Sequence, residues 1–162
     1  MFMEKIGISK RPVVYVTIDD ICSGLFTSQI LTGLIKSAEI DSDRSFLILV
    51  VNRPWKILEH RRRLKIIRKS VLPSNLAIKY IPLLPPLRKA AGNRLSSKLV
   101  TSYLSLLVYI FVRRADAIVH ARSYWPCAAS LQAGFRSVIF EPRSLWTLEN
   151  IAMGDIQEGS SA

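Results

Sequence analysis

Short apolar runs alternate along this chain with longer stretches of helical periodicity, and this alternation limits the fold more than any other feature. The first run, Val13–Ile18, is β-branched and aromatic, which predicts a strand buried on both faces. The predicted strands are Val13–Ile18, Phe46–Val51, Leu76–Ile81, Ala117–His120 and Ser137–Glu141. The predicted helices are Thr27–Glu39, with Thr27 or Ser28 as N-cap, Pro54–Ser70, Arg94–Arg114 and Tyr124–Ala133. We therefore expect an α/β, Rossmann-like three-layer domain with a mostly parallel sheet.

The length and composition favour one domain with a substantial core, because 49% of the 162 residues are hydrophobic. We expect this domain to span residues 13–153, between an N-terminal extension over residues 1–12 and a flexible or truncated tail over residues 154–162. The extension lacks the apolar stretch of a secretory signal, which predicts a cytoplasmic protein. Cys22 and Cys127 are far apart and have no clustered histidines, so we expect neither a disulfide framework nor a metal site.

The charge is strongly positive, with a formal net charge of +11, and 20 of the 23 basic residues precede residue 115. Such an excess favours an anionic partner. Six of these residues lie in or next to the helix predicted from Pro54, namely Arg61, Arg62, Arg63, Lys65, Arg68 and Lys69. This helix is a candidate for peripheral binding to an anionic membrane surface, and a solvated helix face is the alternative. No nucleic-acid recognition motif accompanies the charge, so we expect no nucleic-acid partner.

The apolar stretch Leu99–Val112 is shorter than the roughly 20 residues that a membrane-spanning helix needs. We interpret it as part of a buried helix. A narrow polar strip made of Lys98, Thr101, Ser102 and Ser105 interrupts its apolar circumference. This pattern is expected of a helix that packs against both a sheet and a neighbouring helix.

Polar residues follow several of the predicted strands, where ligands bind in sheets of this type. They are Asp19, Asp20, Ser23, Gly24, Asn52, Arg53, His120, Arg122, Ser123 and Arg143. Carboxylates and amides bind sugar hydroxyls, whereas guanidinium groups and backbone amides at helix starts bind phosphate. The first loop has only Gly24, and the chain has no Gly-rich dinucleotide fingerprint, no Walker loop and no Gly-x-Ser-x-Gly elbow.

Two local patterns carry more information than the rest. One is Ile118-Val119-His120-Ala121-Arg122-Ser123-Tyr124-Trp125-Pro126, and the other is Phe140-Glu141-Pro142-Arg143-Ser144-Leu145-Trp146 with Glu149 three residues later. With Gln29, they resemble the N-terminal domain of family-4-like glycosyltransferases of the two-domain GT-B architecture. Glu141 and Ser144 stand where that family usually has Asp and Gly.

The resemblance implies the acceptor-side half of a nucleotide-sugar-dependent, retaining glycosyltransferase for a polysaccharide or cell-envelope precursor. Its partners would be a glycan or lipid-linked acceptor and a donor-binding domain from elsewhere, with a nucleotide sugar as substrate and no cofactor. It implies a catalytic role for His120 and substrate binding by Asp19, Ser23, Gly24, Arg122, Arg143 and Glu149. The isolated chain is expected to be inactive.

Simpler roles remain open for several of these residues. His120 could be a hydrogen-bonded residue at a strand end, and Arg122 and Arg143 could pair with Glu141, Glu149 or Asp116. Trp125 and Trp146 are expected to pack in the core rather than stack on a sugar. The alternative for the whole chain is a non-catalytic membrane- or partner-binding protein, or an inactive remnant.

Overall fold

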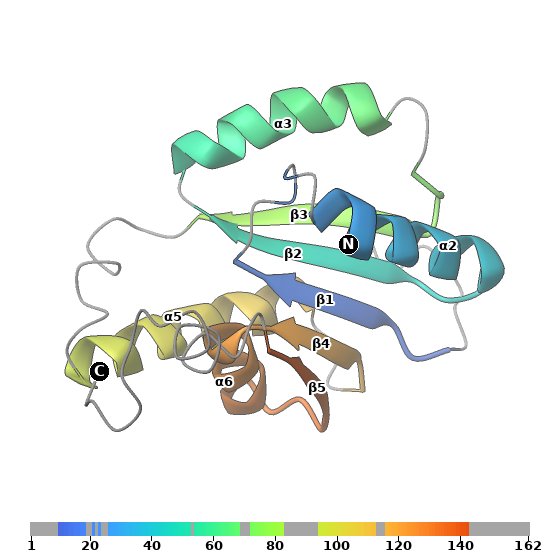
Figure 1. Cartoon of the computed structure of the whole chain (residues 1–162). Coiled ribbons are helices and arrows are strands. Elements are labelled where there is room, and N and C mark those ends of the chain that lie inside the picture. The colour runs from blue at the N-terminus through green and yellow to red at the C-terminus, as the bar shows by residue number, and fades with distance from the viewer. Residues whose placement is uncertain are drawn as a thin grey trace, which may run out of the picture.

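The computed structural model describes residues 10–18, 21, 23, 26–52, 54–68, 72–82, 94–112 and 116–142, with only the backbone for 29, 63–68 and 94–97. Five strands form one sheet in the order β3-β2-β1-β4-β5, and every neighbouring pair is parallel. The strands are β1 (Val13–Thr17), β2 (Phe46–Asn52), β3 (Leu76–Pro82), β4 (Ile118–Arg122) and β5 (Ser137–Glu141). The predicted Rossmann-like α/β architecture is confirmed (Figure 1). The predicted tail and most of the N-terminal extension lie outside the described residues.

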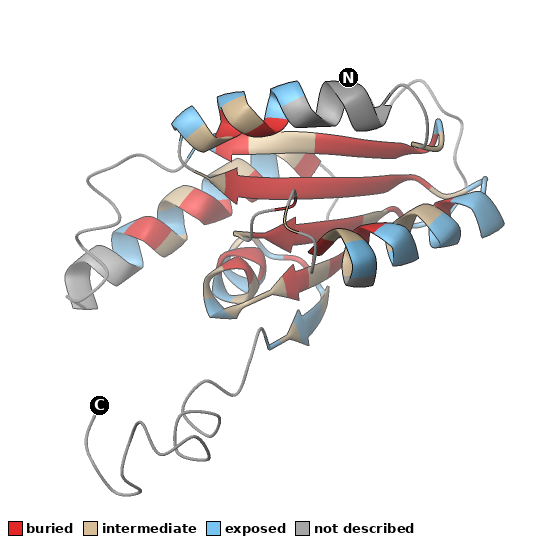
Figure 2. Ribbon diagram, turned by 45° about the horizontal axis from the view of Figure 1, so that its top comes forward, coloured by how far each residue is buried: buried red, intermediate tan, exposed pale blue. Residues whose placement is uncertain are grey.

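Helices cover both faces of the sheet and make the three layers. The first face carries a π-helical segment η1 (Thr27–Leu31), continued by α2 (Thr32–Ile40), and α3 (Pro54–Arg68). On that face His60 of α3 is buried against Tyr80 of β3. The second face carries α5 (Arg94–Val112) and α6 (Tyr124–Gln132). Burial of β1 and β2 between these layers explains their almost unbroken apolar sequence (Figure 2).

The fourth strand is longer than its sequence suggested. It was expected to end at His120 but continues to Arg122, because Ala121 is fully buried and Arg122 is in register with Glu141. Side chains two residues apart on a strand share a face. His120 and Arg122 therefore both project from the first face of the sheet, within the strand and not after it.

The helix after the first loop begins at Thr27, as predicted, and its first segment is π-helical. The Ser23 hydroxyl oxygen accepts a hydrogen bond from the backbone N–H of Phe26 at 3.2 Å, and the Ser23 carbonyl accepts one from Thr27 at 2.9 Å. The Thr27 hydroxyl instead donates to the carbonyl of Ile21. The N-cap residue is Phe26, which makes no side-chain capping hydrogen bond, so the predicted capping role of Thr27 or Ser28 is wrong.

Helix α5 is buried on one side only. Val100, Leu104, Val108 and Val112 recur every four residues and are at most 1% exposed, because they pack on the second face of the sheet. On the opposite side Leu99, Leu106, Tyr109 and Ile110 are 43–59% exposed. The prediction that this helix packs against both the sheet and a neighbouring helix is confirmed, since Gln132 of α6 donates to Ser102 of α5, but its outward side is not buried. No helix among the described residues is long and apolar enough to cross a membrane.

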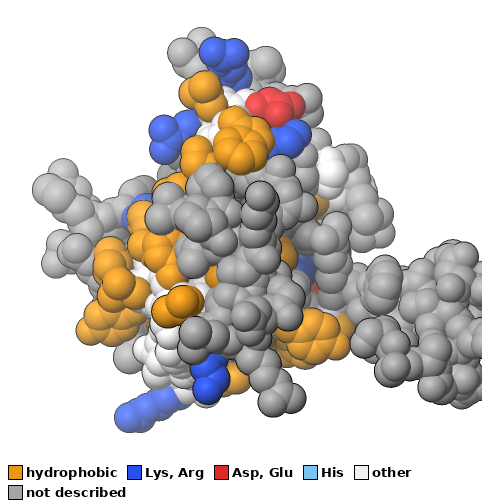
Figure 3. All heavy atoms as spheres, turned by 90° about the vertical axis from the view of Figure 1, so that its left-hand side faces the viewer, with side chains coloured by type: hydrophobic (Ala, Val, Ile, Leu, Met, Phe, Trp, Pro, Cys, Tyr) orange, Lys and Arg blue, Asp and Glu red, His pale blue; other side chains and the backbone are white. Residues whose placement is uncertain are grey.

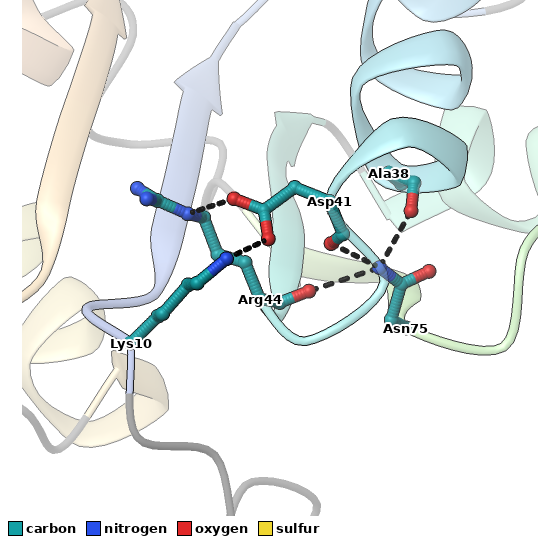
Figure 4. Close-up of polar contacts among 5 residues, drawn as sticks. All are labelled: Lys10, Ala38, Asp41, Arg44 and Asn75. Carbon is teal, nitrogen blue, oxygen red and sulfur yellow. Dashed lines mark hydrogen bonds and ion pairs between the residues drawn. The ribbon is translucent and has the colours of Figure 1, made fainter.

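A polar cluster joins the amino ends of the first three strands (Figure 4). Asp41 accepts hydrogen bonds from Lys10 at 2.8 Å and Arg44 at 2.9 Å. The buried Asn75 amide donates to the carbonyls of Ala38, Asp41 and Arg44 at 2.8, 3.2 and 2.9 Å. Lys10 precedes β1, Arg44 precedes β2 and Asn75 precedes β3. The cluster fixes the loop that leads from α2 into β2.

Candidate functional site

Near the other end of the sheet, three side chains from two other strands converge on the carboxylate of Glu141 in β5. The Tyr15 hydroxyl donates to Oε2 at 2.8 Å, and His120 Nε2 lies 2.9 Å from the same oxygen. Arg122 Nη1 donates to Oε1. Both carboxylate oxygens are therefore engaged, one of them twice. We call Tyr15, His120, Arg122 and Glu141 the Glu141 cluster.

Strand register brings these residues together. Tyr15 of β1 is paired with His120 of β4, and Arg122 is paired with Glu141 of β5. Because the strands are parallel and in register, all four side chains project from the first face. The Tyr15 and His120 rings also meet edge to face with centroids 4.9 Å apart. Their relative positions are consequently set by the sheet and not by a loop.

The electrostatics of the cluster keep its tyrosine protonated. Burial raises the pKa of Tyr15, and the hydrogen bond to the Glu141 carboxylate raises this pKa further, while nearby Arg122 opposes the shift. A neutral hydroxyl donates to the carboxylate without adding charge. The Tyr15 hydroxyl thus orients the Glu141 carboxylate, while the Arg122 guanidinium supplies the positive charge that balances this carboxylate.

Exposure within the cluster increases toward His120. The side chains of Arg122, Glu141 and His120 are 12%, 28% and 34% exposed, respectively. His120 is therefore the member most accessible to a ligand, held in place by its Nε2 contact and by the Tyr15 ring. An imidazole oriented by a carboxylate can accept or donate a proton or bind a hydroxyl or phosphate oxygen. Arg122 adopts the ion pair with Glu141 that was the simpler of its two expected roles.

The turn after β4 is tightly constrained at Ser123. This residue has φ 86° and ψ 160°, a conformation that L-residues other than glycine rarely adopt. Its N–H donates to the carbonyl of Glu141 at 3.0 Å, and its carbonyl accepts from Cys127 at 3.3 Å. The turn therefore starts α6 directly beside Arg122 and ties it to the end of β5.

The other predicted site residues have different fates. The Ser23 hydroxyl oxygen already accepts a hydrogen bond from the backbone N–H of Phe26. Trp125 is partly buried against the core, as expected, and Cys127 is a half-buried free thiol. Asp19, Asp20, Gly24, Arg53, Arg143, Trp146 and Glu149 lie outside the described residues. No group of three or more His, Cys, Asp or Glu side chains in the described part of the chain could hold a metal ion.

The side chains of the predicted membrane-binding helix α3 are described only as far as Arg62. Arg61 and Arg62 are exposed, and Trp55 and Leu58 are exposed beside them. The side chains of Arg63, Lys65 and Arg68, and all of Lys69, lie outside the described residues. Figure 3 looks onto the end of the molecule at which β1 and β2 finish, and exposed hydrophobic side chains stand there beside Lys and Arg.

Sequence reasoning did not identify Tyr15 as a site residue. Tyr15 lies in the middle of an apolar strand and carries no local motif. The only signal was its pairing with His120, which requires the register of two strands about a hundred residues apart.

Together these features define a Rossmann-like α/β domain with an ordered cluster of ionisable side chains toward the carboxyl ends of β1, β4 and β5. No protein-family model, no curated protein and no solved structure matches the chain.

Proposed function

We propose that this chain is the acceptor-side half of a nucleotide-sugar-dependent, retaining glycosyltransferase that acts on a polysaccharide or cell-envelope precursor. The proposal rests on the resemblance of the His-Ala-Arg and Glu-Pro-Arg segments to family-4-like enzymes. The observation that supports it best is the convergence of His120, Arg122 and Glu141 on one sheet face near the strand ends. Sheets of this architecture bind their ligands at that edge.

In this proposal each cluster member has a distinct task. His120, the most exposed member, contacts a hydroxyl or phosphate oxygen of the substrate. Glu141 fixes the orientation of the imidazole, and Tyr15 and Arg122 fix Glu141 in turn. Tyr15, Arg122 and Glu141 are thus positioning residues. They hold the His120 imidazole in place before the substrate binds.

The donor would be bound by a further domain or by a second polypeptide. In retaining transfer of this kind the protein positions the acceptor hydroxyl and stabilises the leaving diphosphate, and it needs no nucleophile of its own. In this proposal the chain supplies only one wall of the cleft, and this wall alone would not support turnover. The acceptor would be a glycan or a lipid-linked glycan.

A second candidate function is a non-catalytic membrane- or partner-binding module. It is favoured by the exposed Trp55 and Leu58 next to Arg61 and Arg62 on α3. A Trp and a Leu beside cationic residues are typical of helices that lie at an anionic membrane surface. Peripheral binding of this kind is also compatible with a transferase that uses a lipid-linked acceptor.

The transferase proposal is tested by co-expressing the chain with the product of the adjacent gene. Radiolabelled UDP-glucose and UDP-N-acetylglucosamine are supplied with membranes of the source cells, and label in the lipid and glycan fractions is counted. We expect transfer by the pair and none by the chain alone. Glu141→Gln and His120→Ala should each lower transfer by about a hundredfold, as loss of a pre-arranged polar contact does in other enzymes.

The matched control is Ile40→Ser on α2, which changes a side chain that is 87% exposed and remote from the cluster. It should transfer at the wild-type rate. Turnover by the isolated chain, or full activity of Glu141→Gln in the pair, would refute the proposal. Vesicle binding without sugar transfer in any combination would favour the second candidate.

A further inference from the structure

The outward side of α5 is an apolar surface on an otherwise charged protein. Leu99, Leu106, Tyr109 and Ile110 are 59%, 58%, 58% and 43% exposed. They recur at helical spacing on the side opposite the residues that pack on the sheet. We call these four residues the α5 stripe. Contiguous exposed apolar side chains of this kind mark surfaces that bind a partner or a membrane.

The charges within the helix that carries the α5 stripe are all of one sign. The helix Arg94–Val112 contains no Asp or Glu, and the sequence places Arg113 and Arg114 directly after it. Lys98 is exposed next to Leu99. Lys79 of the edge strand β3 reaches the same helix, with Nζ 5.6 Å from the centre of the Phe111 ring. The helix that carries the stripe thus has cationic neighbours and no acids of its own.

This combination restricts the occupant. A second copy of the chain would bring two molecules of net charge +11 together through a face without acids, and their repulsion opposes that contact. An anionic bilayer offers an apolar interior for leucine, isoleucine and tyrosine and negative headgroups for Lys98. We propose that the α5 stripe is a membrane-insertion surface that seats the protein on an anionic lipid bilayer.

The proposal fixes an orientation. Helix α5 packs on the second face of the sheet, whereas α3 lies on the first face, where His60 meets Tyr80. A flat bilayer that takes up the whole α5 stripe therefore lies on the side of the sheet away from α3. This surface is different from the α3 surface and does not depend on glycosyl transfer.

The experiment measures sedimentation of the full chain with vesicles of equal parts phosphatidylcholine and phosphatidylglycerol. Leu106→Ser and Ile110→Ser should each weaken partitioning by about tenfold, because each removes much of one apolar side chain that the bilayer would bury. Lys98→Gln removes one positive charge and should weaken partitioning less than either apolar variant. This loss should be larger at low salt than at high salt. Leu58→Ser on α3, where the leucine is 57% exposed, is measured in parallel to compare the two helices. The matched control is Ile40→Ser at the end of α2, where the isoleucine is 87% exposed and belongs to neither surface. It should partition like the wild type.

Several results would overturn the proposal. These are wild-type partitioning by Leu106→Ser and Ile110→Ser, a greater loss with Leu58→Ser than with either, or no binding by the wild-type chain. Sedimentation equilibrium without lipid provides a separate check, in which a dimer that Leu106→Ser dissociates would assign the stripe to a second copy. Urea unfolding of each variant verifies that the exposed substitutions leave the fold intact. Because none of these measurements uses a sugar donor, failure here is distinguishable from failure of the transferase proposal.

Discussion

Two polar clusters lie toward opposite ends of the same sheet and are built in different ways. At the amino ends, the Asn75 amide binds three backbone carbonyls, and Asp41 pairs with the side chains of Lys10 and Arg44. Toward the carboxyl ends, the Glu141 cluster consists of contacts between side chains from β1, β4 and β5. The first arrangement satisfies buried backbone and shapes a loop. The second assembles ionisable groups that no backbone group requires.

The difference separates structural from functional polarity. Burying the Asn75 amide costs desolvation free energy. Its hydrogen bonds to three carbonyls offset this cost, because buried carbonyls without a partner destabilise the fold. A partly exposed carboxylate that holds a histidine, an arginine and a tyrosine contributes less to stability than an apolar replacement often would. Such an arrangement is characteristic of sites where geometry has a chemical use. The comparison therefore predicts that a change at the Asn75 amide costs more stability than loss of one partner of Glu141.

The largest effect on stability is expected from Asn75→Asp. This change points a carboxylate at the carbonyl oxygens of Ala38, Asp41 and Arg44 and should lower the free energy of unfolding by about 3 kcal/mol. Urea denaturation measures the loss. The matched control is Gln132→Glu, which makes the same chemical change at an exposed amide that donates to Ser102. Equal losses in both variants would show that burial of Asn75 is not the source.

An intermediate effect is expected from Tyr15→Phe. Loss of the hydroxyl leaves Glu141 with two partners and should cost about 1 kcal/mol near neutral pH. The raised pKa of Tyr15 stabilises the fold below its ordinary value of about 10, and this contribution is lost as the pH rises beyond it. The wild type should therefore lose more stability than Tyr15→Phe in denaturation curves above that pH. Replacement of the exposed Tyr124 by Phe should retain the alkaline decline, and an unchanged decline in Tyr15→Phe would contradict the assignment.

The smallest effect is expected from Asp41→Asn. Lys10, and then Arg44, hold the pKa of Asp41 below its usual range. The stability from these ion pairs is present above the ordinary aspartate pKa of about 4 and is lost as the pH falls through the lowered value. Asp41→Asn should therefore shift the denaturation midpoint slightly at neutral pH and flatten its decline in acid. Asp43→Asn removes a neighbouring exposed charge and serves as the comparison, and identical acid profiles for the two variants would refute the role of Asp41.

The sheet could be predicted from sequence because its strands are almost uninterrupted apolar runs, and each predicted strand is found with ends shifted by at most two residues. The exception that matters is β4. Arg122 resembles a residue after the strand, and only its pairing with Glu141 shows that the strand continues. His120 and Arg122 could be proposed from their motif, but the role of Tyr15 depends on register between distant segments. The exposed side of α5 was missed because periodicity identifies apolar faces without revealing what packs on them.

The central position of β1 has a consequence for biosynthesis. Val13 pairs with Phe46 on one side and with Ile118 on the other, so β1 is synthesised before both neighbours and long before β4. During that interval the nascent polypeptide exposes an apolar strand edge with unpaired backbone N–H and C=O groups to the ribosome surface and to chaperones. The charged residues that precede and follow this strand, Lys10, Arg11 and Asp19, are suited to keep the emerging segment from associating with its neighbours on a polysome.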